Sequence, residues 1–264
     1  MKLTRAFLVM TLGLGRLATG TNAGACPAAG AAAPHAASLD AYLGWSRPEA
    51  ANPVREISRH MSEGTEEAYE QADRLKDYFI ATKDRGRIIR PQRRWDGIDR
   101  SVEFEIRGMS DSNYATDPET RKSVTGLIVF FEGVVVASKS GGQNTAALST
   151  TEAEWNAAVS CAQSMLHVMN IVESLGLKVK KPMILQVDNK GAVDLANGFS
   201  VGGRSKHFDV KVHFMRELKQ VGLLRVEFIS GDSNQADILT KNVAGPLLAK
   251  HSVSMVTDEK IGIG

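Results

Sequence analysis

The segment VTGLIVFFEGVVVASKS, residues 124–140, holds two runs of apolar, β-branched and aromatic residues on either side of Glu132–Gly133. Such runs favour strands, and a short link that contains glycine is typical of a β-hairpin. Just upstream, VEFEIRGMS, residues 102–110, alternates apolar and charged side chains as a third strand would. These residues predict three consecutive strands.

The chain after this hairpin alternates between helical and strand patterns. Ser149 and Glu152 form a capping box before a long helix, on whose apolar stripe Glu154 and Cys161 both lie. We read Ser140 and the two glycines after it as a loop, and we expect Asp232 or Ser233 to cap a last helix. The remaining segments are a strand at 183–187, helices at 192–197 and 205–221, and a strand at 223–230. The order predicts an α/β fold with a five-stranded mixed sheet flanked by helices.

We divide the chain into four parts. Residues 1–45 are an irregular leader, rich in alanine and glycine, that we expect to be disordered. Residues 46–100 form a helical connection followed by a basic linker, with a helix that starts at Thr65 and is closed by Gly86. Residues 101–245 form the main domain, and residues 246–264 form a C-terminal tail.

Composition excludes some classes of protein. The 264 residues are 43% hydrophobic, which supports a core, and the net charge of +2 neither requires nor excludes nucleic acid. Cys26 and Cys161 give no disulfide framework and no zinc-binding spacing, and we expect Cys161 to be buried. Lys2 and Arg5 precede a short apolar run like that of a signal peptide, but we expect an intracellular protein and no secretion. No apolar run approaches the ~20 residues of a membrane-spanning helix.

Four carboxylates in separate segments are the candidate site: Asp111, Glu154, Asp188 and Asp237. Each aspartate alone is explained as a turn residue, a cap or a partner of a helix dipole. Glu154 is different, because a carboxylate on a core-facing stripe is costly unless something compensates its charge. Taken together, four acids without a histidine or cysteine partner suit a hard cation such as magnesium, with manganese as the alternative. Two such ions about 3.5–4 Å apart commonly serve phosphodiester hydrolysis.

The motifs SDSNYA, ALSTTEAEW, VDNKGAVDLAN, RSKHFDVKVHF and NQADILTK occur in this order over about residues 104–243. In this order they resemble the ribonuclease H domain of copia-type LTR retrotransposon Pol polyproteins. Residues 46–86 resemble the tether that joins reverse transcriptase to that domain. The resemblance implies a ribonuclease H-like fold and cleavage of the RNA strand of an RNA–DNA hybrid with two magnesium ions.

The same resemblance implies roles for individual residues. Asp111, Glu154, Asp188 and Asp237 match the family's metal-binding quartet and would be both catalytic and metal-binding. Its KHxDV motif assigns phosphate contacts to a basic cluster, for which the alternative is a solvated helix face. The candidate nucleic-acid-binding residues are Arg204, Lys206, His207, Lys211, Arg216 and Asn189. The implied partners are an RNA–DNA hybrid and the reverse transcriptase domain of the same polyprotein; we expect no membrane partner.

A departure from the family pattern supports a different hypothesis. Residues 137–143, ASKSGGQ, lack an aromatic and two basic residues that the family carries there, and the chain contains no polymerase motif. The alternative is a catalytically inactive remnant that keeps the fold and binds nucleic acid or a polymerase partner. Retention of all four acids favours the enzyme. The expected location is a cytoplasmic virus-like particle or the nucleus.

Overall fold

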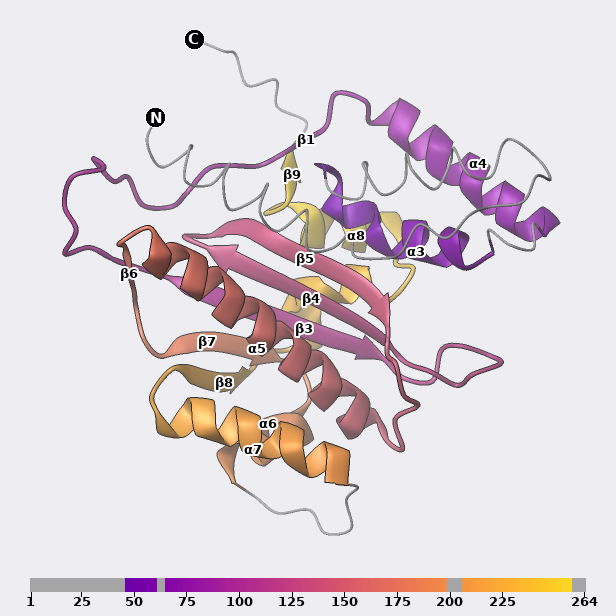
Figure 1. Ribbon diagram of the computed structural model, residues 1–264. Coiled ribbons are helices and arrows are strands. Elements are labelled where there is room, and N and C mark those ends of the chain that lie inside the picture. The colour runs from indigo at the N-terminus through magenta and orange to yellow at the C-terminus, as the bar shows by residue number, and fades with distance from the viewer. Residues whose placement is uncertain (1–45, 61–64, 199–205, 258–264) are drawn as a thin grey trace, which may run out of the picture.

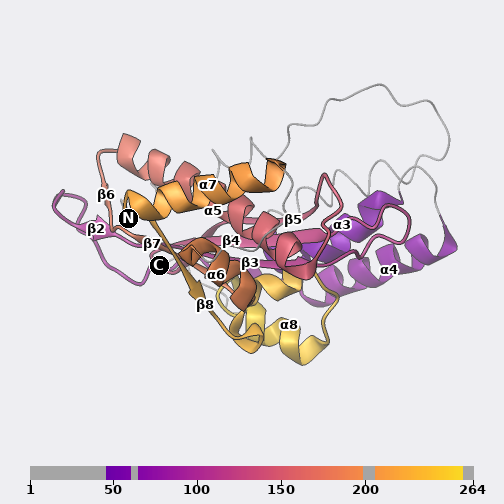
Figure 2. The same ribbon diagram turned by 90° about the horizontal axis from the view of Figure 1, so that it is seen from below.

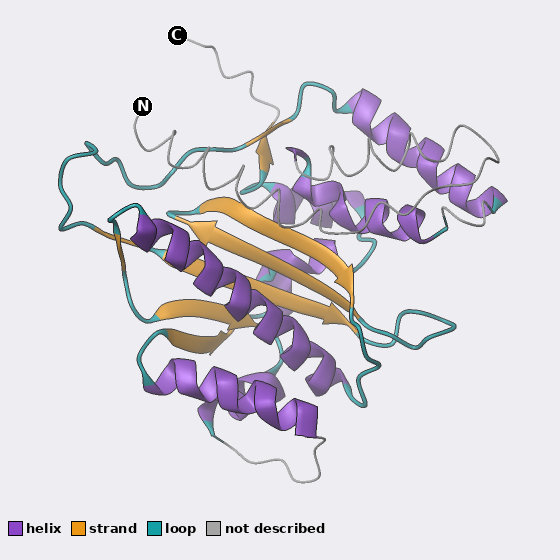
Figure 3. Ribbon diagram, viewed as in Figure 1, coloured by secondary structure: helices purple, strands orange, loops and turns teal. Residues whose placement is uncertain are grey.

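The computed structural model describes residues 46–60, 65–198 and 206–257. Its centre is a five-stranded sheet in the order β5-β4-β3-β7-β8 (Figure 3). The strands are β3 (Ile106–Asn113), β4 (Val124–Phe131), β5 (Val134–Gly142), β7 (Met183–Val187) and β8 (Leu224–Phe228). β4 runs antiparallel to β3 and β5, whereas β7 and β8 continue the sheet parallel to β3. This mixed sheet confirms the predicted α/β, ribonuclease H-like fold.

The predicted hairpin joins β4 to β5 through two residues with positive φ, Glu132 at 48° and Gly133 at 79°. Positive φ at both positions matches the right-handed twist of the strands. The prediction of a loop at residues 140–142 was wrong, because these residues pair with residues 124–126 and extend β5. The predicted strand at 102–110 is divided: β2 (Glu103–Phe104) pairs instead with β6 (Lys178–Val179).

One face of the sheet is covered by α5 (Thr150–Ser174), α6 (Lys190–Asn197) and α7 (Lys206–Gln220) (Figure 1). The helix α5 begins as predicted, since the hydroxyl of Ser149 accepts a hydrogen bond from the backbone N–H of Glu152. Its apolar stripe packs on the strands, and Cys161 is buried there as predicted. The largest part of the hydrophobic core therefore lies between these helices and the sheet.

After β8 the chain forms η2 (Gly231–Ser233), and the opposite face is then covered by η3 (Gln235–Leu239) and α8 (Gly245–Ser252). Figure 2 shows α8 on the far side of the sheet from α5 and α7. The prediction of one last helix capped by Asp232 or Ser233 was wrong. Asn234 is the cap, because its side chain accepts a hydrogen bond from Ala236, and two short 3₁₀ helices stand in place of an α-helix.

The segment before the sheet comprises η1 (Pro48–Ala50), α3 (Ala51–Arg59), α4 (Glu66–Ala81) and β1 (Gly86–Arg87). Thr65 caps α4 as predicted, but this helix ends at Ala81, and Gly86 belongs to β1, which pairs with β9 (Val256–Thr257). The leader 1–45 lies outside the described residues. None of the helices in the described ranges is long and apolar enough to cross a membrane.

The helix α3 contacts the main sheet and the 3₁₀ segment directly. Asn52, only 1% exposed, donates a hydrogen bond of 2.9 Å to the side-chain oxygen of Asn242. Arg55 donates a hydrogen bond of 3.0 Å to the hydroxyl of Ser140 in β5. The segment before the sheet is therefore packed against the same 3₁₀ turn that carries Asp237.

Candidate active site

Three of the four predicted acids meet where β3 and β7 lie side by side. Ser110 of β3 is paired with Val187 of β7 in parallel register, so the residues that follow them, Asp111 and Asp188, are neighbours. Glu154 reaches the same place from the first turns of α5. One carboxylate oxygen from each residue lies within 4.8 Å of the other two. The sheet register and the phase of α5 thus create a cluster of oxygen ligands.

Only one of the two carboxylate oxygens of Glu154 accepts hydrogen bonds among the described residues. Its Oε1 accepts two hydrogen bonds from Ser112, one from the backbone N–H at 3.1 Å and one from the hydroxyl at 3.0 Å. Its Oε2 is buried and has no hydrogen-bond partner among the described residues. A buried carboxylate oxygen without a partner costs free energy, and a bound cation would remove that cost.

Burial dominates the electrostatics of the cluster. It raises the pKa of Glu154 to about 8, and the charges of Asp111 and Asp188 add to this effect. Burial also raises the pKa of Asp111 to about 6, although Lys241 and Thr240 act in the opposite direction. The pKa of Asp188 is likewise raised by burial. Without a cation, this site favours protons on its carboxylates, so cations and protons compete for the same oxygens.

Asp237 lies beside the three-carboxylate cluster, with a lysine between. Nζ of Lys241 is 2.5 Å from Oδ1 of Asp237 and 3.6 Å from Oδ1 of Asp111. The hydroxyl of Thr240 donates a short hydrogen bond to Oδ2 of Asp111. Both oxygens of Asp111 therefore face groups from the turn that follows η3.

This turn approaches the sheet closely because β4 carries a glycine opposite Asp111. Gly126 is paired with Asp111, and a Cβ at Gly126 would lie 2.7 Å from Cγ2 of Thr240 and 2.8 Å from the carbonyl oxygen of Ala236. Asn234, fully buried, donates a hydrogen bond of 2.9 Å to the carbonyl oxygen of Ser110. Gly126 leaves room for η3, and the hydrogen bond of Asn234 holds η3 against β3. Together they place η3 beside the site.

The predicted nucleic-acid-binding residues occupy several different environments. Asn189 caps α6 by accepting a hydrogen bond from Ala192, Lys211 donates to the side chain of Asn156 at 2.7 Å, and Arg216 donates to the carbonyl oxygen of Leu195 at 3.4 Å. Arg204 lies outside the described residues. Lys206 and His207 begin α7, and their side chains are not described.

Four residues of the site are missing from the prediction: Ser112, Asn234, Thr240 and Lys241. The sequence could have indicated two of them, Lys241 and Ser112. Lys241 lies four residues after Asp237, and residues four apart face each other in a helical turn. Ser112 lies between two residues of the quoted motif SDSNYA. Asn234 and Thr240 contact the site through tertiary packing, which no local pattern reports.

The chain is similar to long polyproteins of plant and yeast retrotransposons. It is 37% identical over 138 residues to the Retrovirus-related Pol polyprotein from transposon TNT 1-94 of Nicotiana tabacum, which covers 52% of this chain and 10% of the relative. It is 28% identical over 200 residues to the Pol polyprotein from transposon RE1 of Arabidopsis thaliana, covering 76% of this chain and 13% of the relative. It is 24% identical over 207 residues to the Ty1-LR3 Gag-Pol polyprotein of Saccharomyces cerevisiae, covering 77% of this chain and 11% of the relative. The chain thus spans about a tenth of the length of these relatives.

Among solved structures, LC11-RNase H1 from compost has a TM-score of 0.40 and 16% identity, over 51% of this chain and 91% of that chain. The N-terminal RNase H domain of rv2228c from Mycobacterium tuberculosis has a TM-score of 0.39 and 15% identity. The match covers 58% of this chain and 99% of that chain. No protein-family model matches the chain. The sequence relatives confirm the resemblance inferred from the motifs. This chain is homologous to a segment of retrotransposon Pol polyproteins, and its main sheet has the ribonuclease H-like order and directions.

Proposed function

We propose that this chain is a ribonuclease H that hydrolyses the RNA strand of an RNA–DNA hybrid during retrotransposon reverse transcription. The observation that carries the proposal is the convergence of Asp111, Glu154 and Asp188 within 4.8 Å, with a buried and unpartnered Oε2 on Glu154. An ion pair does not account for the position of Glu154, because among the described residues this carboxylate has no cationic partner. An oxygen-only site of this kind fits magnesium, with manganese as the alternative.

In the proposed mechanism the four carboxylates serve as cation ligands. Asp111, Glu154 and Asp188 would hold a divalent cation, and Asp237 would complete the shell of a second one. A pair of divalent cations supplies an activated water and stabilises the leaving oxygen of a phosphodiester. Water adds to phosphorus, the bond to the 3′ oxygen breaks, and the products are a 5′-phosphate and a 3′-hydroxyl. No covalent intermediate with the protein forms.

The protein positions charge and does not act as the nucleophile. Ser112 fixes one oxygen of Glu154 and leaves the other without a hydrogen bond among the described residues. Thr240 fixes one oxygen of Asp111. Such supporting hydrogen bonds typically orient metal-binding side chains. For the hybrid, we propose phosphate contacts from Arg204, Lys206, His207, Lys211, Arg216 and Asn189, with the reverse transcriptase domain as a partner in the polyprotein and action inside the cell.

The test is cleavage of a hybrid labelled on its RNA strand, in magnesium, in manganese and in EDTA. Wild type is compared with Asp188→Asn and with Asp194→Asn, a matched control on the exposed side of α6. We expect metal-dependent cutting of the RNA strand by wild type and the control, a loss of at least about a hundredfold in Asp188→Asn, and no cutting of an all-DNA duplex. Folded wild type that cuts in neither metal contradicts the proposal and leaves the inactive, nucleic-acid-binding remnant.

A further inference from the structure

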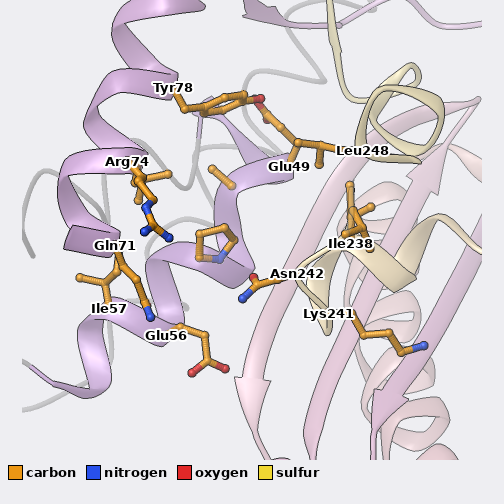
Figure 4. A pocket seen from close by; sticks show the side chains of 14 residues that line it. Glu49, Glu56, Ile57, Gln71, Arg74, Tyr78, Ile238, Lys241, Asn242 and Leu248 are labelled. Carbon is orange, nitrogen blue, oxygen red and sulfur yellow. The ribbon is translucent and has the colours of Figure 1, made fainter. Parts of the chain in front are cut away.

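The side chain of Lys241 connects the site to the segment before the sheet. Its stem lines a cavity of about 360 Å³ whose other walls include Pro53 of α3, Leu75 of α4 and Leu248 of α8. Figure 4 shows the amine pointing away from α3 and α4, on the side of the strands. The backbone N–H of Lys241 donates to the carbonyl oxygen of Asp237 at 3.0 Å, so the lysine is fixed at the end of the η3 turn.

The amine lies between two carboxylates, of which one belongs to the three-carboxylate cluster and the other does not. Asp111 belongs to the three-carboxylate cluster, whereas Asp237 lies outside it and pairs with Lys241. Each of the two carboxylates offers Oδ1 to the same amine, at 3.6 Å from Asp111 and 2.5 Å from Asp237. A lysine amine is positively charged at neutral pH, and here it faces two carboxylates.

A second divalent cation would need the space that this amine fills. Magnesium binds carboxylate oxygens at 2.0–2.1 Å. A cation shared by Asp111 and Asp237 would lie between the two carboxylates that both contact the amine. Two positive charges so close together repel strongly, even with partial screening. The amine and the cation exclude each other.

We propose that Lys241 is an internal counter-ion that occupies the second cation position in the substrate-free protein. This proposal rests on the proposed function. In the substrate-free state a single divalent ion binds, held by Asp111, Glu154 and Asp188. The side chain of Lys241 is 41% exposed, so the amine has a path outward, and a phosphate of the hybrid is a suitable partner for it there. Substrate binding then removes the lysine and opens the second position.

The experiment counts bound ions and does not depend on activity. Magnesium binding to substrate-free protein is measured by isothermal titration calorimetry, and manganese binding by electron paramagnetic resonance of the free ion. The neutral variants Lys241→Met and Lys241→Gln are compared with wild type. The matched control is Lys250→Met, because the amine of Lys250 donates to the backbone oxygen of Asp232 and, within the described ranges, to no carboxylate. Circular dichroism in EDTA establishes that each variant is folded.

We expect one ion per chain in wild type and in Lys250→Met over the accessible concentration range, and two ions in both neutral Lys241 variants. Removing the competing charge should strengthen binding at the second position by roughly tenfold or more. Two ions in wild type, or one ion in both folded Lys241 variants, overturns the proposal for Lys241 and leaves the proposed ribonuclease H intact. No ion in any protein contradicts the metal site itself, and with it both proposals.

Discussion

Ser112 donates both its backbone N–H and its hydroxyl to the same oxygen of Glu154, at 3.1 and 3.0 Å. The second oxygen of Glu154 is left buried without a partner. A side chain that is only 7% exposed is thus fixed in orientation but incompletely satisfied. This arrangement stabilises the protein poorly by itself, and it suits a ligand that carries positive charge.

Replacing Glu154 by glutamine should separate stability from activity. Glu154→Gln keeps an acceptor for Ser112 and is neutral at every pH, whereas folding of the metal-free wild type at pH 7.5 requires Glu154 either to take up a proton or to bury its charge. In EDTA at pH 7.5 we therefore expect the free energy of unfolding to rise by about 2 kcal/mol. Hybrid cleavage should be lost, because a cation ligand is gone. Urea unfolding and the cleavage assay measure the two effects. Glu173→Gln, on the exposed side of the same helix, is the control and should change neither. A destabilised Glu154→Gln variant would contradict this account.

The stability of the metal-free protein should decrease as the pH rises. Burial raises the pKa of Asp111 to about 6 and that of Glu154 to about 8, whereas the same groups titrate near pH 4 in the unfolded chain. Between these values the folded state holds more protons than the unfolded state, so the free energy of unfolding falls with pH. In EDTA we expect a decline from about pH 4.5 to 8, measured by urea unfolding. Magnesium should reverse the decline most strongly at the upper end of this range, and an equal effect at pH 5 would contradict the prediction.

A methyl group at Gly126 should displace the 3₁₀ turn. Its Cβ would lie 2.7–3.0 Å from atoms of Thr240, Ala236 and Leu239, and one of these is a backbone oxygen. For Gly126→Ala we expect a loss of about 1–3 kcal/mol in stability and a clear loss of cleavage. Gly142→Ala is the control, since its Cβ would meet nothing within 4 Å. Equal stability of the two variants in thermal unfolding would show that the turn moves freely.

The contact between α3 and the turn after η3 should contribute to stability. The buried side chain of Asn52 donates to Asn242 at 2.9 Å and accepts from Arg55 at 2.9 Å. Asn52→Ala removes both bonds and leaves their partners unsatisfied, so we expect a loss of about 1–3 kcal/mol. Urea unfolding checks this value against Ser58→Ala, an exposed position on the same helix. An unchanged midpoint for Asn52→Ala would mean that α3 is not part of the cooperative unit.

Local patterns were sufficient for the elements whose structure is set by neighbouring residues. The positive φ angles at Glu132 and Gly133 follow from the hairpin, and the cap at Ser149 follows from its spacing to Glu152. The helical phase of Glu154 correctly indicated an inward-facing carboxylate. Asp188 directly follows β7 and Asp111 lies two residues before the end of β3, and the parallel pairing of these strands brings the two aspartates together.

Distant contacts determine the features that the sequence did not reveal. Gly141 and Gly142 have poor strand propensity, yet pairing with Thr125 and Val124 makes them part of β5. Asn234 becomes a cap because its amide group is buried against Ser110. The position of Lys241 depends on the approach of η3 to the sheet, which a glycine on another strand permits.

The bond between Asn52 and Asn242 joins residues 190 positions apart, and β1, which precedes the main sheet, pairs with β9 at the end of the described chain. Contacts of such separation form late, because the loop between them must close before they contribute. The turn with Asp237, Thr240 and Lys241 packs against the sheet and against α3. During synthesis, it cannot make these contacts until almost all of the described chain has left the ribosome. We therefore expect the turn that carries Asp237, and with it the completed site, to take its final position late in folding.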